Sequence, residues 1–443
     1  MAESQREVIR SIEWSNWAGT ETTRLARIAT PRSEEEVAEE VVKARDRGLR
    51  VKAIGAGHSF TGVAVTDGLQ LRMGALTGVT TLDATRGEAT VRAGTPLHVL
   101  NAELAQLGLA LPNLGDVDRQ SIAGALGTGT HGTGLRLTGL TGGVRSLRIV
   151  LADGSVVDCS PEREPELFEA ARLGLGALGV VTEVTIAVVP AFLLHAVERP
   201  EALASVLDGL DDDIEANDHF EFYWYPHTDR ALTKRNNRVD AGTAARPLPR
   251  WRSYLDDELL SNRAYELLNR IATRVPRTTK PISAVSARAL TGREYVDASH
   301  KVFITDRDVR FMEAEWAFPR AALADVLAEL KTWVDTHDEL ISFPVECRVA
   351  APDDVWLSTA YQRESSYIAV HRYHRQARGA YFDAFEAIAM EHGGRPHWGK
   401  MHSRDVDFFR AAYPRFGDFL AVRDRVDPAR VFGNPYLERV LGA

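Results

Sequence analysis

The segment VKAIGAGHSF, residues 51–60, combines a short apolar run with a glycine-rich loop and a histidine. Gly55 and Gly57 let the main chain bend sharply and approach a ligand closely, and successive N–H groups in such a loop bind anionic oxygens. A nucleotide phosphate site needs no more than that. The additional His58 therefore indicates an imidazole placed at the bound ligand; the alternative is a surface turn that contains a histidine by chance.

A second glycine-rich stretch, QSIAGALGTGTHGTG at residues 120–134, contains five glycines and four hydroxyl residues. Glycine loses more conformational entropy on ordering than any other residue, so we do not expect this stretch to form an element of the core. Charge is nearly absent, and the apolar side chains Ile122, Ala123, Ala125 and Leu126 favour burial over disorder. We interpret the stretch as an ordered track along an extended cofactor.

The composition narrows the class of protein. A chain of 443 residues, 44% hydrophobic and 26% charged, is typical of a globular protein of two domains. The net charge of −9 argues against nucleic acid or an anionic membrane as partner. Cys159 and Cys347 lack the spacing of a metal site or a disulfide framework, so we expect no metal. The N-terminus lacks the apolar core of a signal peptide, and no apolar run approaches the roughly 20 residues of a membrane span, so we expect a cytoplasmic protein.

Strand and helix patterns alternate over the first 190 residues. A helix is expected at 34–48, because Ser33 precedes three acidic residues that suit a helix N-terminus. Apolar spacing predicts a second helix at 96–107, and alternation predicts strands at 51–54, 69–73, 89–93, 147–151, 155–158 and 180–189. Beyond residue 190 we expect an aromatic strand at 219–226, a polar excursion at 233–252, helix–strand units at 319–373 and a C-terminal helix from 418.

Residues 174–179, GLGALG, match the G-x-G-x-x-G pattern of dinucleotide-binding proteins. That pattern requires a strand before the glycines and a helix after them, so that the helix N-terminus meets the pyrophosphate. Here a helix-like segment, 165–172, precedes the glycines and a strand follows them. We therefore interpret them as a tightly packed helix-to-strand connection and not as a nicotinamide-cofactor site.

Three segments carry a resemblance to a known family: GAGHSF at 55–60, SIAGALGTGTHGTG at 121–134 and RPHWGK at 395–400. In this order they resemble the flavin oxidoreductases of the vanillyl-alcohol oxidase type, and within them the aldonolactone and alditol oxidases. The likeness runs from NWAG at 16–19 to FGNP at 432–435. It implies an α+β fold with a two-part FAD-binding domain, residues 1–190 and 418–443, and an inserted α+β cap domain for the substrate, residues 191–417.

The resemblance also assigns cofactor-binding residues. In the family a histidine at the place of His58 is bonded covalently to the 8α carbon of FAD; a non-covalent or phosphate contact is the alternative. His131 either contacts a flavin phosphate or supports the glycine-rich track. The remaining residues implied to bind FAD are Ala53, Ile54, Gly55, Ala56, Gly57 and Ser59 at the pyrophosphate, Ser121, Gly124, Ala125, Leu126 and Gly127 along the flavin, Val181 at the adenine, and Gly115 and Asp116.

Glu346 and Arg348 alternate along an expected strand, so their side chains project from one face. The apolar neighbours Ile341, Phe343 and Val345 indicate burial, where a carboxylate and a guanidinium must be paired. The alternative is an exposed ion pair worth under about 1 kcal/mol. In the family such a pair faces the flavin and the substrate, with the arginine stabilising the reduced flavin and the glutamate orienting hydroxyl groups.

Lys400 matches a lysine that the family places near the reacting carbon. A cation there lowers the pKa of the substrate hydroxyl or stabilises a developing oxyanion. His371, on the expected strand 367–373, reaches either the substrate or the core. His397 is expected to support its loop, and Glu315 is a weaker candidate for a contact with a substrate hydroxyl.

Gly115 falls where the family places the residue that screens the flavin from O2. A methyl group there would impede O2, so the glycine favours an oxidase over a dehydrogenase; the alternative is an ordinary turn glycine before Asp116.

The resemblance implies oxidation of the C2 hydroxyl of an aldono-1,4-lactone such as L-gulono-1,4-lactone, with O2 as acceptor and with H2O2 and an ascorbate-type product. Oxidation of a primary alcohol of an alditol such as xylitol or sorbitol, or the lactone reaction as a dehydrogenase, are alternatives within the family. A binding protein that kept the fold without the chemistry is the alternative outside it. Nothing in the sequence indicates an oligomeric state.

Overall fold

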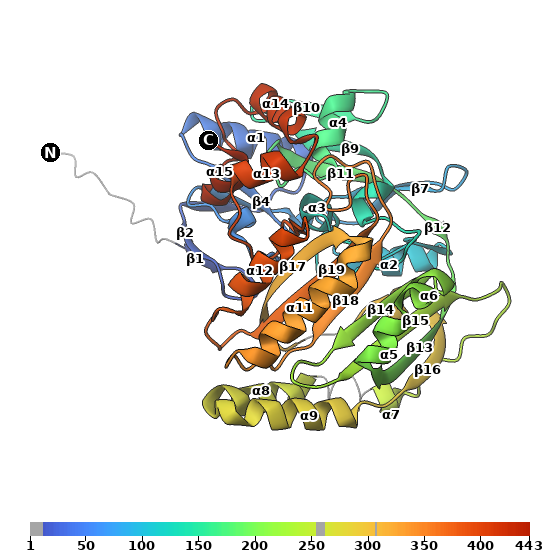
Figure 1. The fold of residues 1–443 in the computed structure, drawn as a ribbon. Coiled ribbons are helices and arrows are strands. Elements are labelled where there is room, and N and C mark those ends of the chain that lie inside the picture. Colours follow the sequence, from blue (N-terminus) through green and yellow to red (C-terminus); the bar gives the residue numbers. More distant parts are fainter. Residues whose placement is uncertain (1–11, 254–261, 306–307) are drawn as a thin grey trace.

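Three β-sheets of three or more strands organise the chain into two domains (Figure 1). The computed structural model describes residues 12–253, 262–305 and 308–443. The first domain combines N-terminal residues with the C-terminal tail, and the cap domain is formed by most of the residues between them. This arrangement agrees with the predicted α+β fold, in which a cap is inserted into a two-part first domain.

The first domain contains a parallel sheet of order β3-β5-β4 and an antiparallel sheet of order β10-β9-β11-β7-β6. The strands are β3 (Arg27–Ala29), β4 (Val51–Ile54), β5 (Leu69–Arg72), β6 (Val79–Asp83), β7 (Glu88–Arg92), β9 (Val144–Val150), β10 (Val156–Cys159) and β11 (Val180–Ala187). Two short pairs are β1 (Ile12–Ser15) with β2 (Thr22–Leu25) and β8 (Leu109–Ala110) with β12 (Val189–Pro190). The helices are α1 (Glu34–Asp46), α2 (Leu97–Gln106), α3 (Ile122–Thr128) and α4 (Pro165–Ala171).

Helix α3 corrects the prediction that the second glycine-rich stretch forms no element of the core. The Ser121 hydroxyl accepts the N–H of Gly124 at the start of the helix, and Gly129 ends it in the left-handed conformation, with φ of +82°. Ile122 and Ala125 are buried in the core of the first domain. Capping residues at both ends therefore allow a helix of seven residues where composition alone predicted an irregular track.

The cap is one eight-stranded sheet of order β16-β13-β15-β14-β18-β19-β17-β20. Its strands are β13 (Leu193–Ala202), β14 (His219–Trp224), β15 (Arg230–Arg238), β16 (Arg293–Ala298), β17 (Phe311–Pro319), β18 (Val345–Ala350), β19 (Ser365–Tyr373) and β20 (Arg395–Pro396). Its helices are α5 (Leu203–Asp208), α6 (Leu210–Ala216), α7 (Arg250–Ser253), α8 (Tyr265–Arg274), α9 (Thr279–Ala289), α10 (Ser299–Phe303), α11 (Leu323–Thr336) and α12 (Tyr381–Glu391). Among the described residues, no helix is long and apolar enough to cross a membrane.

Two adjacent rows of side chains show why this sheet has two different faces. Paired residues of neighbouring strands point to the same face. One row is Phe222–Cys347–Ile368–Trp316, and these residues belong to the hydrophobic core formed with α11 and α12. The next row is Tyr223–Glu346–Ala369–Glu315. The sheet is therefore apolar toward its helices and polar on its opposite face.

Strand β15 corrects the expectation of a polar excursion at 233–252. Residues 233–238 belong to β15, which pairs with β13 on one side and β14 on the other. Thr233 and Asn236 are buried, and Arg235 forms ion pairs with Glu201 and Asp213. Polar residues fit an interior strand here, because side chains of neighbouring elements pair with their charges and hydrogen-bonding groups.

The C-terminal tail returns to the first domain through α13 (Val406–Ala412), α14 (Phe416–Val426) and α15 (Pro435–Leu441). Trp398, Phe409 and Tyr413 already pack in the core of the first domain, together with residues of α3 and α4. The chain therefore returns to the first domain before residue 418, the position at which the sequence analysis expected the return to begin. The apolar side chains of α13 and of the preceding segment explain the earlier start, because they complete this core.

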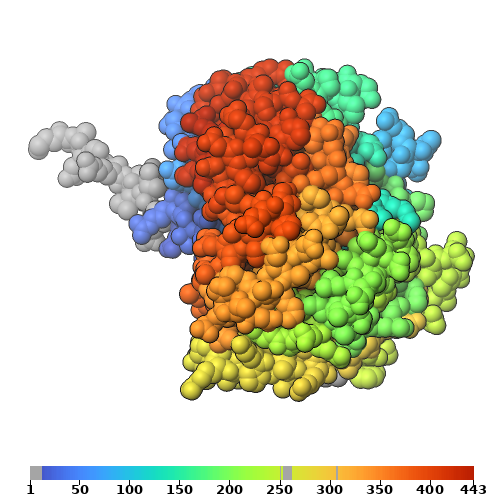
Figure 2. Space-filling view, in the orientation of Figure 1, coloured from blue at the N-terminus to red at the C-terminus, as the bar shows by residue number. Residues whose placement is uncertain are grey.

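Asn434 fastens the tail to the N-terminal region. Its Nδ2 donates to the carbonyl oxygens of Gly62, Val63 and Val65 at 2.9, 3.1 and 2.9 Å, and its Oδ1 accepts the N–H of Leu437 at the start of α15. The side chain is fully buried. In Figure 2 the C-terminal residues, in red, continue into the blue N-terminal surface without a gap. The amide of Asn434 thus joins the C-terminal tail to the segment at Val63, which lies 371 positions earlier in the sequence.

We predict that Asn434→Ala lowers the free energy of unfolding by about 2–4 kcal/mol, because a helix cap is lost and buried carbonyl groups lose their donor. Urea-induced unfolding measures this value. The control is Ser33→Ala, which removes the exposed cap of α1 and should cost about 1 kcal/mol. Equal costs for the two variants would contradict the proposed fastening role.

Candidate active site

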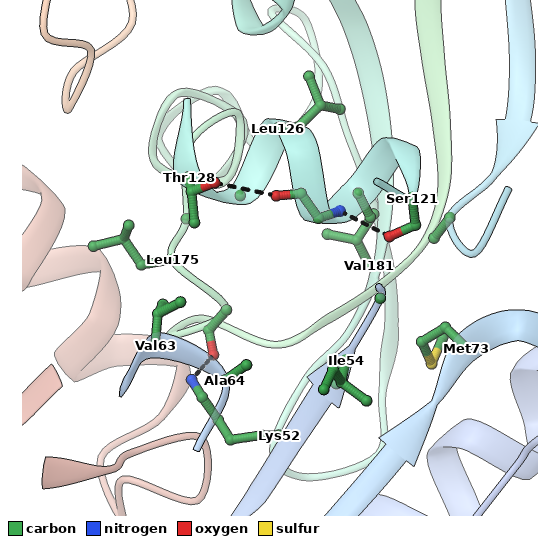
Figure 3. Close-up of a pocket in the computed structure, with 18 of the residues that line it drawn as sticks. Lys52, Ile54, Val63, Ala64, Met73, Ser121, Leu126, Thr128, Leu175 and Val181 are labelled. Carbon is green, nitrogen blue, oxygen red and sulfur yellow. Dashed lines mark hydrogen bonds between the residues drawn. The ribbon is translucent and has the colours of Figure 1, made fainter. Parts of the chain in front are cut away.

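A cleft of about 1110 Å³ runs between α3, the loop after β4 and the glycine-rich residues 174–179 (Figure 3). Gly55 makes the close approach of loop and helix possible, since a Cβ atom there would lie 2.2 Å from the Ser121 hydroxyl oxygen. Main-chain groups and small apolar side chains form most of the lining. Such a lining suits an extended dinucleotide whose phosphates are bound by main-chain N–H groups, so the residues present fit FAD.

Most of the predicted cofactor residues line this cleft. They are Ala53, Ile54, Gly55, Ala56, Gly57, His58, Ser59, Ser121, Gly124, Leu126, Gly127 and Val181. Ala125 does not, because its side chain faces the hydrophobic core from the opposite side of α3. Gly115, Asp116 and His131 line a second cavity.

All residues of 174–179 except Ala177 also line the cleft, although the sequence pattern indicated only a connection. They do connect α4 to β11, as predicted, and so do not form the strand–loop–helix turn of a nicotinamide site. Their high glycine content is the signal that could have indicated a close approach of the main chain to a ligand.

Lys52 lies at the base of the cleft and was missed by the sequence analysis. Its Nζ donates to the carbonyl oxygens of Gly176 at 3.0 Å and Phe432 at 3.1 Å, which ties β4, the glycine-rich connection and the C-terminal tail together. Burial, with the nearby charge of Arg423, lowers the pKa of Lys52 to about 7. A lysine inside the strand VKAI gives no sign of this contact in the sequence.

His58 lies where the cleft meets the second cavity, because its side chain lines both. Trp17 stacks on its ring, with ring centroids 5.4 Å apart. Burial and the charges of Lys400 and Arg119 lower the pKa of His58 to about 4. The imidazole is therefore neutral near pH 7 and keeps a lone pair for nucleophilic attack.

The second cavity, of about 1490 Å³, lies between the first domain and the polar face of the cap sheet. The first domain contributes His58, Gln120 and the segment at Gly115. The cap contributes Glu313 and Glu315 of β17, Glu346 and Arg348 of β18, and His371 of β19, and Lys400 follows β20. The structure thus brings all four predicted catalytic residues, Glu346, Arg348, His371 and Lys400, to one cavity.

Arg348 lies in a cluster of acidic groups. Its Nε donates to Glu221 Oε2 at 2.9 Å, its Nη2 contacts Glu346, and Asp116 Oδ1 is 3.6 Å away. Burial disfavours the charged guanidinium, but Glu346 and Glu221 outweigh that effect and raise the pKa of Arg348. Arg348 is therefore a permanent cation, and its buried ion pair with Glu346 confirms the predicted pairing.

Glu221 and Tyr223 of β14 support this pair and were not predicted. The Tyr223 hydroxyl lies 2.9 Å from Glu346 Oε1 and 3.1 Å from Glu221 Oε1. Burial would raise the pKa of Glu221, but the charges of Arg348 and Lys234 lower it. The polar Glu221 between two phenylalanines in HFEFYW is the signal that could have placed it on the polar face.

Lys400, whose side chain is 23% exposed, forms an ion pair with the buried Glu313. Its Nζ lies 2.5 Å from Glu313 Oε2, and Glu313 Oε1 lies 3.6 Å from His371 Nε2. Burial opposes the charge of the lysine, but Glu313 and Glu315 raise its pKa. Burial likewise opposes ionisation of Glu313, yet the charge of Lys400 and the nearby His371 lower its pKa to about 2. Lys400 is consequently a cation that does not accept protons near neutral pH.

His131, Glu315 and His397 place possible ligand atoms within 4.8 Å of one another. His131 Nε2 lies 3.2 Å from Glu315 Oε1, and the His131 ring stacks on Tyr367. His397 Nδ1 accepts the N–H of Gly399, so its proton is on Nε2. This hydrogen bond leaves His397 Nδ1 unavailable as a metal ligand.

Gly115 is less open than the sequence suggested. A Cβ atom at this position would lie 3.1 Å from the carbonyl oxygen of His131 and 3.2 Å from the Thr130 methyl carbon. The glycine therefore has a packing reason beside any effect on O2, and its presence does not by itself separate an oxidase from a dehydrogenase.

Comparison with known proteins agrees with this geometry. Residues 184–440 match the family of D-arabinono-1,4-lactone oxidase, and residues 25–160 match an FAD-binding domain. The chain is 42% identical to L-gulono-1,4-lactone dehydrogenase of Mycobacterium tuberculosis, over 97% of this chain and 99% of that protein. It is 33% identical to L-gulonolactone oxidase of Bos taurus, over 97% and 98%.

The fold has solved counterparts as well. Cholesterol oxidase of Brevibacterium sterolicum aligns with a TM-score of 0.81 at 17% sequence identity, covering 97% of this chain and 96% of that chain, a likeness that concerns the fold alone. Together with the family match, it confirms the predicted vanillyl-alcohol oxidase type of FAD-binding domain with an inserted cap. The chain therefore belongs to the D-arabinono-1,4-lactone oxidase family.

Proposed function

We propose that the protein is an FAD-dependent enzyme that oxidises an aldono-1,4-lactone, such as L-gulono-1,4-lactone, at its C2 hydroxyl. The observation that carries the proposal is the polar wall of the second cavity, where Lys400 and the Glu346–Arg348 pair face His58 at the end of the cofactor cleft. A lactone rich in hydroxyl groups matches this wall, which offers both carboxylate acceptors and cationic donors. The names of the relatives from Mycobacterium tuberculosis and Bos taurus support the same substrate class.

The side chains of the cavity have different roles toward the substrate. FAD, when bound, supplies the acceptor for the hydride that leaves the oxidised carbon. Lys400 remains charged and stabilises negative charge on the substrate oxygen, whose proton passes to solvent as the hydride leaves the carbon. Glu346 accepts hydrogen bonds from substrate hydroxyls, and Arg348 holds Glu346 in place while its positive charge compensates negative charge in the cavity. His371 is held by the carbonyl oxygen of Pro344 at 3.0 Å and lies beside Glu313, 3.6 Å from its Oε1.

His58 is proposed to carry FAD covalently. Its neutral imidazole and its place at the junction of the two cavities support this assignment. The acceptor of the electrons is proposed to be O2, with H2O2 as product, although relatives of both the oxidase and the dehydrogenase kind share this fold. The cytoplasmic location remains a prediction.

The test of the substrate class is anaerobic bleaching of the flavin absorbance, with L-gulono-1,4-lactone and xylitol in parallel. We expect bleaching by the lactone and none by xylitol. Bleaching by xylitol alone would assign the chain to alditol oxidation, and no bleaching by either would refute the substrate class. Readmitted air should restore the colour rapidly for an oxidase; slow recovery would mean a dehydrogenase.

Lys400→Met should lower kcat about 10²–10³-fold, because the charge that stabilises the substrate oxyanion is lost. Lys400→Arg should recover part of this loss. The matched control is Glu313→Gln, which removes the partner of Lys400 but keeps the cation, and should cost kcat less than Lys400→Met does. Steady-state kinetics on L-gulono-1,4-lactone give these values, and a Lys400→Met variant with wild-type kcat would exclude the assigned role.

The lowered pKa of His58 predicts how covalent attachment depends on pH. The attachment rate in protein reconstituted with FAD should stay constant from about pH 8 to about pH 5.5, whereas a histidine with an ordinary pKa of about 6.5 would become roughly tenfold slower. Flavin fluorescence of the denatured protein on a gel measures attachment. His58→Ala should show none; fluorescence that persists in this variant would point to another residue.

A further inference from the structure

Glu315 differs from the other carboxylates of the polar cap face in how few protein groups bind it. Glu221, Glu313 and Glu346 each have a lysine or arginine partner. The Glu315 carboxylate has one hydrogen-bonding partner in the described part of the chain, the ring of His131. Both oxygens of a carboxylate accept hydrogen bonds, and buried polar atoms are rarely left without partners. Glu315 is 4% exposed and lines the second cavity, so its remaining acceptor capacity is available to a molecule bound there.

His131 belongs to the glycine-rich stretch after α3 and contacts Glu315 across the boundary between the two domains. Its Nδ1 lies 2.9 Å from the carbonyl oxygen of Gly132, and its Nε2 lies 3.2 Å from Glu315 Oε1. A carbonyl oxygen only accepts hydrogen bonds, so Nδ1 carries a proton. Tyr367 stacks on the ring, with ring centroids 3.8 Å apart, and fixes its plane. The imidazole is therefore held with Nε2 toward Glu315.

The two side chains form a buried pair of opposite charges. Burial alone would raise the pKa of Glu315, but the charge of His131 and its hydrogen bond hold that pKa well below its ordinary value. Glu315 is therefore a carboxylate that only accepts hydrogen bonds, and His131 Nε2 must donate one to it. With a proton on each ring nitrogen, the imidazole is a cation. A neutral side chain in place of His131 would leave the buried carboxylate without its charge partner.

The position of Glu315 on the sheet indicates which part of the substrate it meets. Glu313 and Glu315 project from the same face of β17, about 7 Å apart along the strand. Glu313 pairs with Lys400, where the proposed function places the reacting C2 hydroxyl. The C3 hydroxyl of a lactone is attached to the neighbouring ring carbon and lies too close to C2 to span this separation. The hydroxyl groups of the exocyclic chain lie further from C2 and can reach Glu315.

We propose that Glu315 binds a hydroxyl group of the lactone's exocyclic chain and that His131 is the positioning residue that holds Glu315 as an acceptor. The inference rests on the proposed function, since it requires a lactone in the second cavity. The substrate hydroxyl donates to the carboxylate at the acceptor sites that His131 leaves unoccupied. A hydrogen bond to a charged group contributes more to binding than one to a neutral group. The pair therefore selects lactones that carry an exocyclic chain over a bare lactone ring.

Anaerobic reduction of the FAD-loaded enzyme by two lactones tests the proposal. L-gulono-1,4-lactone carries an exocyclic chain with hydroxyl groups, whereas L-erythrono-1,4-lactone has the same ring and the same C2 and C3 hydroxyls without the chain. The dependence of the flavin bleaching rate on lactone concentration gives Kd and the limiting rate separately. Glu315→Gln should raise Kd for L-gulono-1,4-lactone about 10-fold to 100-fold and leave Kd for L-erythrono-1,4-lactone within about twofold. The limiting rates should change less than Kd does.

His131→Asn should raise Kd for L-gulono-1,4-lactone selectively, because Glu315 loses the cation that holds it ionised. Combined with Glu315→Gln it should add little, because the two side chains act as one unit. The matched control is His219→Asn, which removes another buried histidine, one that lines neither the cleft nor the second cavity. This control should leave Kd for both lactones unchanged. FAD content and thermal unfolding establish that each variant is folded.

An equal rise in Kd for both lactones in Glu315→Gln would overturn the inference, as would an unchanged Kd for L-gulono-1,4-lactone. If His131→Asn loses FAD but the molecules that retain FAD show an unchanged Kd, His131 only supports the glycine-rich stretch, and the inference is likewise wrong. These outcomes leave the proposed function intact. If neither lactone reduces the flavin of the wild-type enzyme, the proposed function is refuted and this inference with it.

Discussion

The burial of charge on one face of the cap sheet is the constraint on which the site depends. Four carboxylates, Glu221, Glu313, Glu315 and Glu346, are withdrawn from water on this face. Without a positively charged partner, each buried carboxylate would destabilise the fold by several kcal/mol or take up a proton. Arg348, Lys400 and His131 lie within ion-pairing distance of them, so the acids remain charged and fixed in position. The opposite face of the same strands supplies the hydrophobic core that keeps this arrangement rigid.

The two domains are complementary in chemistry. The first domain offers main-chain groups and small side chains along the cleft. This lining suits a cofactor that is bound mainly by main-chain groups of the protein. The cap offers charges held at defined points, which suits a substrate recognised by its hydroxyl groups. His58 belongs to the first domain but lines both spaces. Burial, and then the positive charge of Lys400, lower the pKa of His58.

The sequence predicted the elements whose pattern is local and missed contacts that depend on pairing between distant strands. Glu346 and Arg348 were recognisable because they alternate within one strand with apolar neighbours. Glu221 lies 127 positions from Arg348, and their pairing follows from the register of β14 and β18 and not from spacing. Lys400 meets Glu313 of β17 from the segment after β20, a contact that spacing does not indicate either. Helix α3 was missed because its capping residues, Ser121 and Gly129, outweigh the low helix propensity of its glycines.

The most direct measurement of the central claim is a crystal structure of the FAD-loaded Lys400→Met variant with L-gulono-1,4-lactone bound under anaerobic conditions. If the polar face of the cap recognises the substrate, the lactone lies in the second cavity with hydroxyl groups within hydrogen-bonding distance of Glu346 and Glu315. A lactone that binds outside this cavity, or whose hydroxyls contact only residues of the first domain, would contradict the claim.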